Sequence, residues 1–295
     1  MPTRYLAGLF ALGAIWGAAF MLIKIAVAEI PPAALVAVRL ALAVAILLGV
    51  LYARGLRLPL GRRLWRDFVL MGVIGVVLPF MLISWGQQHI PSGVTAILNA
   101  TIPLFSVLLA YVWTREERLG GLKLAGLIVG FAGVVLAVGS GGLSLASAGT
   151  QGQLAVLAAA GCYAVSGMYG RRAFQGMAPL VPASGQLLAG ALVMVALLPL
   201  LGGLPATLPS AGALAALLAL AVFPTAMAYI LFYWIMDHIG ATRTSTVTYL
   251  IAPFGLLFGA LFLHERVGPG VIGGLALVIL GILLANGVLR PNAEG

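Results

Sequence analysis

The chain has 295 residues, of which 62% are hydrophobic and only 8% are charged, against about 25% charged residues in soluble proteins. A soluble domain of this composition could not cover its own surface, and disordered, collagen-like and nucleic-acid-binding classes are excluded because each needs a polar or charged chain. The formal net charge of +9 therefore has to be interpreted by where the basic residues lie relative to membrane spans.

Apolar stretches long enough to cross a bilayer follow one another along the chain. A spanning helix needs about 20 mostly apolar residues, and short connectors rich in proline, glycine and serine separate the stretches. A ten-strand barrel is disfavoured, because barrel strands alternate polar and apolar residues. The predicted helices are residues 5–28, 31–53, 67–89, 92–113, 119–138, 151–171, 179–200, 210–236, 241–263 and 269–289.

The first stretch also has features of a secretory signal peptide, with Arg4, an apolar run and small residues at 26–28. The apolar core of a signal peptide has about 7 to 15 residues, whereas this run extends over residues 5–23. We therefore interpret it as a spanning helix, with cleavage as the alternative.

Basic residues are distributed unevenly between the two sides. If both termini are cytoplasmic, 13 of the 16 basic residues lie in inner segments, only Arg266 lies in an outer connector, and Lys24 and Arg39 lie within spans. The positive-inside rule therefore predicts cytoplasmic N and C termini. The inner residues are Arg4, Arg54, Arg57, Arg62, Arg63, Arg66, Arg115, Arg118, Lys123, Arg171, Arg172, Arg243 and Arg290.

The second half of the chain repeats the first in order, at offsets of 147 to 150 residues. Chance similarity among apolar segments is the alternative, and the shared order across four helix pairs argues against it. The matches are Trp16 with Tyr163, Lys24 with Arg171, Arg39 with Gln186, Trp85 with Trp234, His89 with His238, Pro103 with Pro253, Glu117-Arg118 with Glu265-Arg266, Gly126 with Gly274 and Gly133 with Gly281.

Five spans in each half would give the two halves opposite orientations in the membrane. We predict an all-α membrane protein whose ten transmembrane helices form two inverted five-helix repeats, residues 1–138 and 151–295, joined by a linker at 139–150. Many secondary transporters have this architecture, with a site near the midplane at the repeat interface.

Several motifs together resemble a known family: Trp16-Gly17, Asn99-x-x-x-Pro103, the two Glu-Arg pairs and the glycine-spaced fifth and tenth helices. The chain is similar to the EamA branch of the drug/metabolite transporter superfamily, and within it most similar to YddG-like amino-acid exporters. This resemblance implies the EamA fold and a multi-pass carrier of the bacterial inner membrane that moves amino acids, aromatic and other neutral ones included, out of the cytoplasm.

Polar and aromatic residues at helical spacing inside the spans mark faces turned away from lipid, where a polar group is costly. Hydrogen bonding between helices, for the serines and threonines, and ordinary packing, for the aromatic residues, are the alternatives to ligand contact. The predicted substrate-binding residues of a central cavity are Trp16, Phe20, Phe80, Ser84, Gln87, Thr95, Asn99, Tyr163, Tyr229, Tyr233, Ser245 and Tyr249.

Four prolines within spans are predicted hinges or gates, with simple structural kinks as the alternative: Pro79, Pro103, Pro224 and Pro253. Pro103 should free the carbonyl of Asn99, and Pro253 that of Tyr249. Such acceptors at mid-membrane depth could receive a substrate ammonium.

Charge within the spans is scarce. Arg39 lies about two turns into the second span, and we expect it to face protein and pair with carbonyl groups. A structural role is favoured because its repeat counterpart, Gln186, is neutral, and binding of a substrate carboxylate is the alternative. Lys24 and Arg171 lie near span ends, where their side chains should extend to the membrane surface.

Small residues at four-residue spacing permit close helix contact, and the fifth and tenth spans carry Gly126, Gly130 and Gly133, and Gly270, Gly274 and Gly281. These faces could join the two repeats of a monomer or two protomers of a homodimer, and both alternatives stay open.

The leading functional hypothesis is export of neutral amino acids by alternating access, with the lipid bilayer and a small substrate as the partners and without metal, cofactor or nucleic acid. Other metabolites or drugs are the alternative substrates, although an exporter of organic cations would need a carboxylate in mid-span and a sugar-phosphate carrier several basic groups. An intramembrane enzyme is a remote alternative, since no span pairs a histidine with a carboxylate at helical spacing and no P-loop is present.

Overall fold

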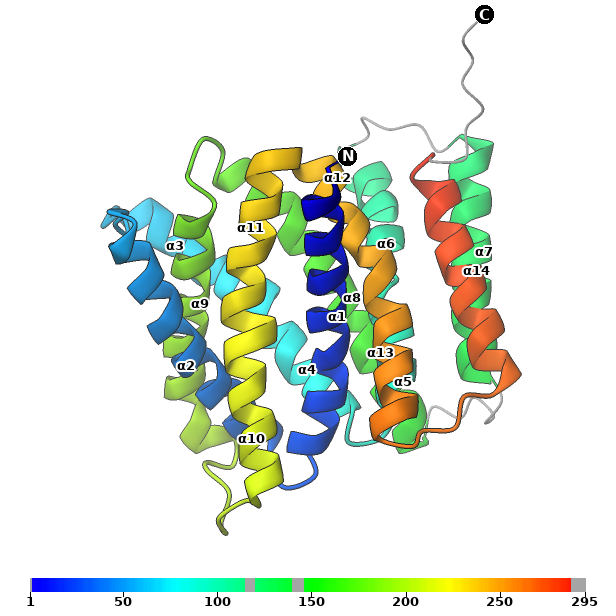
Figure 1. Ribbon diagram of the computed structural model, residues 1–295, viewed down its shortest axis with the longest axis horizontal. Helices are drawn as coiled ribbons and strands as arrows, with labels where there is room; N and C mark the ends of the chain where they lie inside the picture. Colours follow the sequence, from blue (N-terminus) through cyan, green and yellow to red (C-terminus); the bar gives the residue numbers. More distant parts are fainter. Residues whose placement is uncertain (1, 115–119, 140–145, 288–295) are drawn as a thin grey trace, which may run out of the picture.

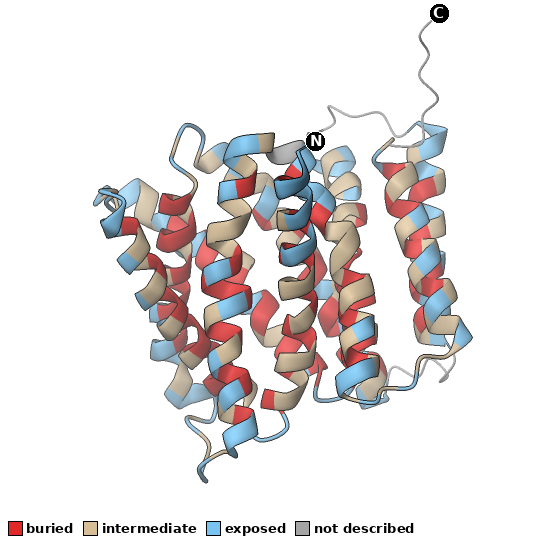
Figure 2. Cartoon of the chain, in the orientation of Figure 1, coloured by how far each residue is buried: buried red, intermediate tan, exposed pale blue. Residues whose placement is uncertain are grey.

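The computed structural model describes residues 2–114, 120–139 and 146–287, and the regular elements among these residues are all helical. The helices run up and down through one bundle, and the first turn of α1 and the last turn of α14 lie at the same end of it (Figure 1). Buried residues line the helix faces that are turned toward the interior of the bundle (Figure 2). The Glu117-Arg118 pair, Arg115, Arg290 and part of the predicted linker lie outside the described residues.

The first half contains α1 (Thr3–Ala26) and α2 (Pro32–Ala53). Next come α3 (Arg62–Gly72), the π-helix η1 (Val73–Val77) and α4 (Leu78–Gly86), which form one continuous rod. The half ends with α5 (Ser92–Asn99), α6 (Ile102–Leu109) with the π-turn η2 (Ala110–Thr114), and α7 (Gly121–Val138).

The second half follows the same order. It contains α8 (Ala148–Ala173), α9 (Leu180–Leu197) with η4 (Leu198–Leu201), and a rod made of α10 (Ala211–Leu220), the π-helix η5 (Ala221–Met227) and α11 (Ala228–Ile239). The short α12 (Ala241–Thr244) and η6 (Ser245–Val247) lead into α13 (Thr248–Phe262), and α14 (Pro269–Ala285) ends the half.

These elements confirm the all-helical membrane fold. Eight helical segments of the described chain are long and apolar enough to cross a membrane; α14 is shorter, with 17 residues, and α8 is not among the eight. The total of ten spans and the side on which the termini lie stay predictions. The predicted third span, 67–89, is wrong at both ends, because the rod already begins at Arg62 and ends at Gly86.

The two halves share irregular features of the backbone. The rod of each half contains a π-helix at the matching position: η1 beside Pro79 in the first half and η5 around Pro224 in the second. Near the end of each rod a tryptophan packs on the histidine one turn later, with 4.9 Å between ring centroids for Trp85 and His89 and again for Trp234 and His238. Matched irregularities of this kind support the pairing of the halves.

The predicted glycine faces meet between α7 and α14, which run side by side (Figure 1). A Cβ atom on Gly133 would lie 2.7 Å from the carbonyl oxygen of Gly274, and one on Gly126 would lie 2.7 Å from that of Gly281. Backbones therefore touch where no side chain intervenes. The contact joins the two repeats of one chain, as in the first of the two alternatives, and the oligomeric state stays a prediction.

Replacing Gly133 by Ala should therefore destabilise the protein, because the new methyl group must push α7 and α14 apart. We expect a loss of about 1–3 kcal/mol, as for other overpacked contacts, measured by thermal unfolding in detergent. Gly161→Ala in α8 is the matched control, since nothing lies within 4 Å of the position that its new methyl group would take. Equal melting temperatures for the two variants would contradict the close contact.

Candidate functional site

Arg39 is the charged residue at the centre of the candidate site. It lies about 10 Å along α2 from the start of that helix and is only 4% exposed. Its Nε donates to the Thr225 hydroxyl at 2.8 Å, and its guanidinium carbon lies 4.0 Å from the centroid of the Phe80 ring. The expected pairing with carbonyl groups is therefore wrong: the partners are a hydroxyl and an aromatic face.

The guanidinium of Arg39 is incompletely satisfied. Of its five N–H donors, only Nε–H has a hydrogen-bond acceptor among the described residues, and no carboxylate there lies within ion-pair distance. A buried charge without a counter-charge costs several kcal/mol, so an anion beside this guanidinium would be favourable.

Aromatic side chains surround this charge. The phenols of Tyr163 and Tyr229 are close enough to interact with it electrostatically, and both rings pack against the apolar cluster that contains Phe80. The Tyr229 and Tyr233 rings are 6.1 Å apart. The structure thus brings together the four predicted aromatic residues of the third, sixth and eighth spans.

The π-helix η5 supplies polar groups to the site, namely the Thr225 hydroxyl and the Pro224 carbonyl. Because Pro224 has no N–H, the backbone around it leaves hydrogen-bonding groups to be satisfied by side chains. The Thr225 hydroxyl donates to the Leu220 carbonyl at 2.7 Å, and Trp16 Nε1 donates to the Pro224 carbonyl at 3.1 Å. Thr225 was missed in the sequence; its position directly after an intramembrane proline was the available signal.

Three of the predicted polar residues are buried with unpaired atoms. Ser84 Oγ, both amide atoms of Gln87 and Asn99 Oδ1 have no hydrogen-bond partner among the residues that the structure describes. Ser84 and Gln87 follow Phe80 on one face of the same rod, and Asn99 lies about 10 Å into α5, at a depth similar to that of Arg39. Buried polar atoms left unpaired are costly and are commonly satisfied by water or a ligand.

The remaining predicted residues lie in other surroundings. Phe20 belongs to an apolar core cluster, and the Thr95 hydroxyl donates to the Pro91 carbonyl of its own helix. Ser245 is exposed at the helix end, and the Tyr249 hydroxyl accepts a bond of 2.9 Å from Asn286. The contacts described for these residues do not include Arg39, so their role as ligand contacts stays a prediction.

The prolines act on the backbone in different ways. The predicted fourth span, residues 92–113, is interrupted, since α5 ends at Asn99 and α6 begins at Ile102, with Pro103 as its second residue. Pro253, its repeat counterpart, lies inside the uninterrupted α13, and the irregular turn there is η6, upstream of it. The expected symmetry of the two prolines therefore does not extend to the helix break.

Two charged side chains of opposite sign, Lys24 and Glu265, bind the backbone at the connector between α4 and α5, and we call this arrangement the outer clamp. Lys24 Nζ donates to the carbonyls of Gln87 and Ile90, at 2.6 and 3.0 Å. The Glu265 carboxylate accepts from the backbone N–H groups of Ser92 and Gly93, at 2.7 and 3.0 Å. The expectation that Lys24 extends to the membrane surface is thus wrong, because the chain itself provides its acceptors.

The Glu265 part of the outer clamp joins the two repeats at the end predicted to be outside, because Glu265 comes from the second repeat and Ser92 and Gly93 from the first, whereas the Lys24 bonds stay within the first repeat. A further link at this end has the same character: Glu29 accepts from the backbone N–H and the hydroxyl of Ser210, each at 2.6 Å. These bonds hold the pKa of the Glu29 carboxyl below its usual range. In contrast, Arg171, the counterpart of Lys24 at the opposite end, is exposed and has no hydrogen-bond acceptor among the described residues.

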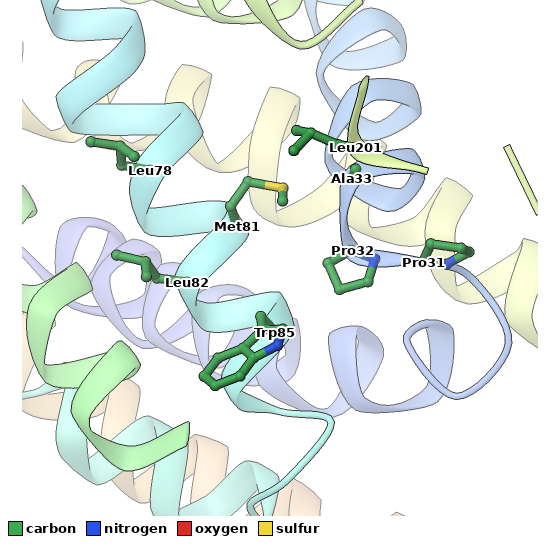
Figure 3. Close-up of a pocket in the computed structure, with 8 residues that line it drawn as sticks. All are labelled: Pro31, Pro32, Ala33, Leu78, Met81, Leu82, Trp85 and Leu201. Carbon is green, nitrogen blue, oxygen red and sulfur yellow. The ribbon is translucent and has the colours of Figure 1, made fainter. Parts of the chain in front are cut away.

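An apolar hollow of about 360 Å³ lies apart from this site, between the start of α2, the middle of α4 and the end of η4 (Figure 3). Met81 and Leu201 extend into it from opposite sides. Its lining offers no charged side chain, and none of the predicted binding residues contributes to it. Such an apolar hollow suits a hydrocarbon group better than a polar solute.

Comparison with known families gives two matches to one family model. The model described as the EamA-like transporter family matches residues 3–139 and residues 150–287. The two matched ranges have nearly the same length and together cover almost the whole chain.

Full-length relatives carry transporter names. The chain is 22% identical to the uncharacterized transporter YoaV of Bacillus subtilis (96% of each chain) and 26% identical to the uncharacterized inner membrane transporter YedA of Escherichia coli (95% and 88%). It is 29% identical to a probable terminal-alkyne amino-acid exporter of Streptantibioticus cattleyicolor, over 92% of this chain and 89% of the exporter. A solved crystal structure shares the fold, with a TM-score of 0.69 at 23% identity, over 98% of this chain and 99% of the other.

Breaking the outer clamp should open the predicted outer end. In a Cys162→Ala background, a cysteine introduced by Ser84→Cys is buried and should react slowly with a membrane-impermeant thiol reagent added from that side. Glu265→Ala removes two charge-assisted bonds, worth about 1.5–3 kcal/mol each, so labelling should accelerate by roughly tenfold or more. Asp237→Asn, which removes an exposed carboxylate elsewhere, is the control and should leave labelling unchanged. Unchanged labelling in the Glu265 variant would show that the contact does not restrict access.

Proposed function

We propose that this chain, which belongs to the EamA-like transporter family and is a multi-pass protein of the inner membrane, exports small zwitterionic metabolites, with neutral amino acids as the main substrates. The substrate would bind at the repeat interface near mid-membrane depth, and alternating access of the two repeats would carry it across. The unpaired groups of the site support the substrate class, and the unequal ends of the bundle support the direction of opening.

One observation carries the substrate class: the unpaired donors of Arg39 and the unpaired amide oxygen of Asn99 lie at a similar depth, each about 10 Å from the start of its helix. Arg39 offers N–H groups without an acceptor, which suits a carboxylate, and a guanidinium can bind a carboxylate in a bidentate manner. Ser84 and Asn99 offer oxygen atoms without a donor, which suits an ammonium group. A zwitterion supplies both complements in one small molecule.

The aromatic residues suggest which side chains the substrate carries. Phe80, Tyr163, Tyr229 and Tyr233 are rigid, largely apolar groups that favour ring-bearing or aliphatic side chains over charged ones. The probable amino-acid exporter among the relatives supports the same substrate class.

Alternating access is supported by the unequal ends of the bundle. At the predicted outer end, Glu265 and Glu29 accept four hydrogen bonds from the other repeat, whereas at the opposite end Asp67 accepts one, from Tyr169. We infer that the opposite, cytoplasmic end, which has fewer such bonds among the described residues, admits substrate in this conformation. The π-helices beside Pro79 and Pro224 would be the flexible points at which the rods bend during exchange.

Other functions fit the site less well. An exporter of organic cations would need a buried carboxylate at mid-depth, and the buried acidic residue of the described chain, Asp67, lies near the start of α3 and is already bonded to Tyr169 and Arg66. A sugar-phosphate carrier would need several basic groups, and Arg39 is the deep one. The described residues also hold no group of three or more potential metal ligands that an intramembrane metalloenzyme would use.

Arg39→Gln tests the carboxylate site, because it places at position 39 the residue type of its repeat counterpart. Loss of charge-assisted hydrogen bonds worth about 1.5–3 kcal/mol should weaken amino-acid binding by roughly ten- to a hundredfold. In proteoliposome counterflow, the wild type should prefer a labelled neutral amino acid to its amide, and the variant should lose this preference.

Arg54→Gln, on the exposed connector after α2, serves as the control and should transport as the wild type does. Retained discrimination between acid and amide in Arg39→Gln would show that Arg39 is structural. Absence of counterflow with every neutral amino acid in the wild type would overturn the amino-acid assignment itself.

A further inference from the structure

A second hollow, of about 300 Å³, lies between the first turns of α3 and the last turns of α8. Its lining is unlike that of the substrate site, because three arginines converge there with a single carboxylate. The lining residues are Arg63, Leu64, Arg66, Asp67, Tyr169, Arg172 and Ala173.

The carboxylate does not neutralise this hollow. Asp67 is buried, and its Oδ1 accepts from the Tyr169 hydroxyl at 2.8 Å and lies 3.3 Å from the Arg66 guanidinium. These bonds use Asp67 to tie α3 to α8. Arg63 and Arg172 have no acidic partner within the described part of the chain, so two positive charges of the hollow remain uncompensated.

The position of Arg63 at the start of a helix makes the uncompensated positive charge of the hollow more unfavourable. It lies in the first turn of α3, where the helix dipole already favours anions and disfavours cations, and no acidic residue of that turn offsets it. An anion in the hollow would relieve the repulsion between these charges and would interact favourably with the helix start.

The depth of the hollow matches the headgroup layer of a bilayer. Arg63 precedes the first fully buried residue of the rod, Phe68, by five positions, or about 7–8 Å of helix. The polar layer on each side of the hydrocarbon has a thickness of about 5–8 Å. Trp65, whose Nε1 donates to the Pro59 carbonyl at 2.9 Å, is an aromatic residue of the kind that marks this interface.

We propose that this hollow binds the phosphate of an anionic phospholipid in the cytoplasmic leaflet, with Arg63 and Arg172 as the phosphate ligands and Arg66 as a supporting charge. The site lies apart from Arg39 and does not depend on the substrate assignment. Basic pockets between membrane helices on the cytoplasmic side recognise anionic headgroups by the same chemistry.

The test compares thermal unfolding of the purified full-length protein in detergent with added short-chain phosphatidylglycerol, phosphatidylcholine or inorganic phosphate. Phosphatidylglycerol should stabilise the wild type at concentrations at which the other two do not. The double variant Arg63→Gln/Arg172→Gln should need at least about tenfold more phosphatidylglycerol for the same stabilisation. The double variant Arg54→Gln/Arg57→Gln removes the same charge from the connector between α2 and α3, outside the hollow, and should respond as the wild type does.

Equal weakening in both double variants would overturn the proposal, since it would indicate diffuse attraction to the basic face. Equal stabilisation by inorganic phosphate would assign the site to free phosphate instead of a lipid. If the glutamine variant does not fold, Arg63→Lys/Arg172→Lys keeps the charge but loses the planar fork, and it should weaken binding relative to the wild type; an unchanged response there would also refute the site.

Discussion

Hydrocarbon offers no hydrogen bonds, so every polar group that enters the membrane must find its partner within the protein, in water or in a ligand. Most of the side-chain hydrogen bonds at helix ends and irregular turns of this structure satisfy backbone groups that would otherwise lack a partner. Thr225 and Trp16 satisfy carbonyls around the proline of η5, Lys24 satisfies the carbonyls at the end of α4, and Glu265 satisfies the N–H groups at the start of α5. The groups without such partners are accordingly the informative ones.

Arg39 is the clearest of these groups, because it combines a buried charge with unused donors. Its aromatic neighbours shield it from lipid, yet an aromatic face alone stabilises a cation by only about 2 kcal/mol or somewhat more when desolvated. A transporter can tolerate this deficit, since the missing interaction is the one that the substrate supplies. The same reasoning applies to the unpaired oxygens of Ser84 and Asn99.

The inverted repeat explains how such a site could face both sides in turn. The π-helices η1 and η5 occupy equivalent places in the two halves, and the glycine contact between α7 and α14 joins the halves. Hydrogen bonds to carboxylates also join the halves, through Glu265 and Glu29 at one end and through Asp67 at the other. Flexible points at equivalent places and bonds that can break at either end suit two interconverting arrangements of similar energy.

By itself the sequence determined the helical class, the approximate spans, the order of the repeat and the residue types of the site, because apolar run length and helical periodicity are local properties. Only the tertiary structure decided which residues meet. It placed Thr225 beside Arg39, moved Phe20 into the core, turned Lys24 inward to the connector after α4 and paired the glycine faces within one chain. These outcomes depend on contacts between residues far apart in the chain, since the cost of burying a polar group is set by the partner that packing brings to it.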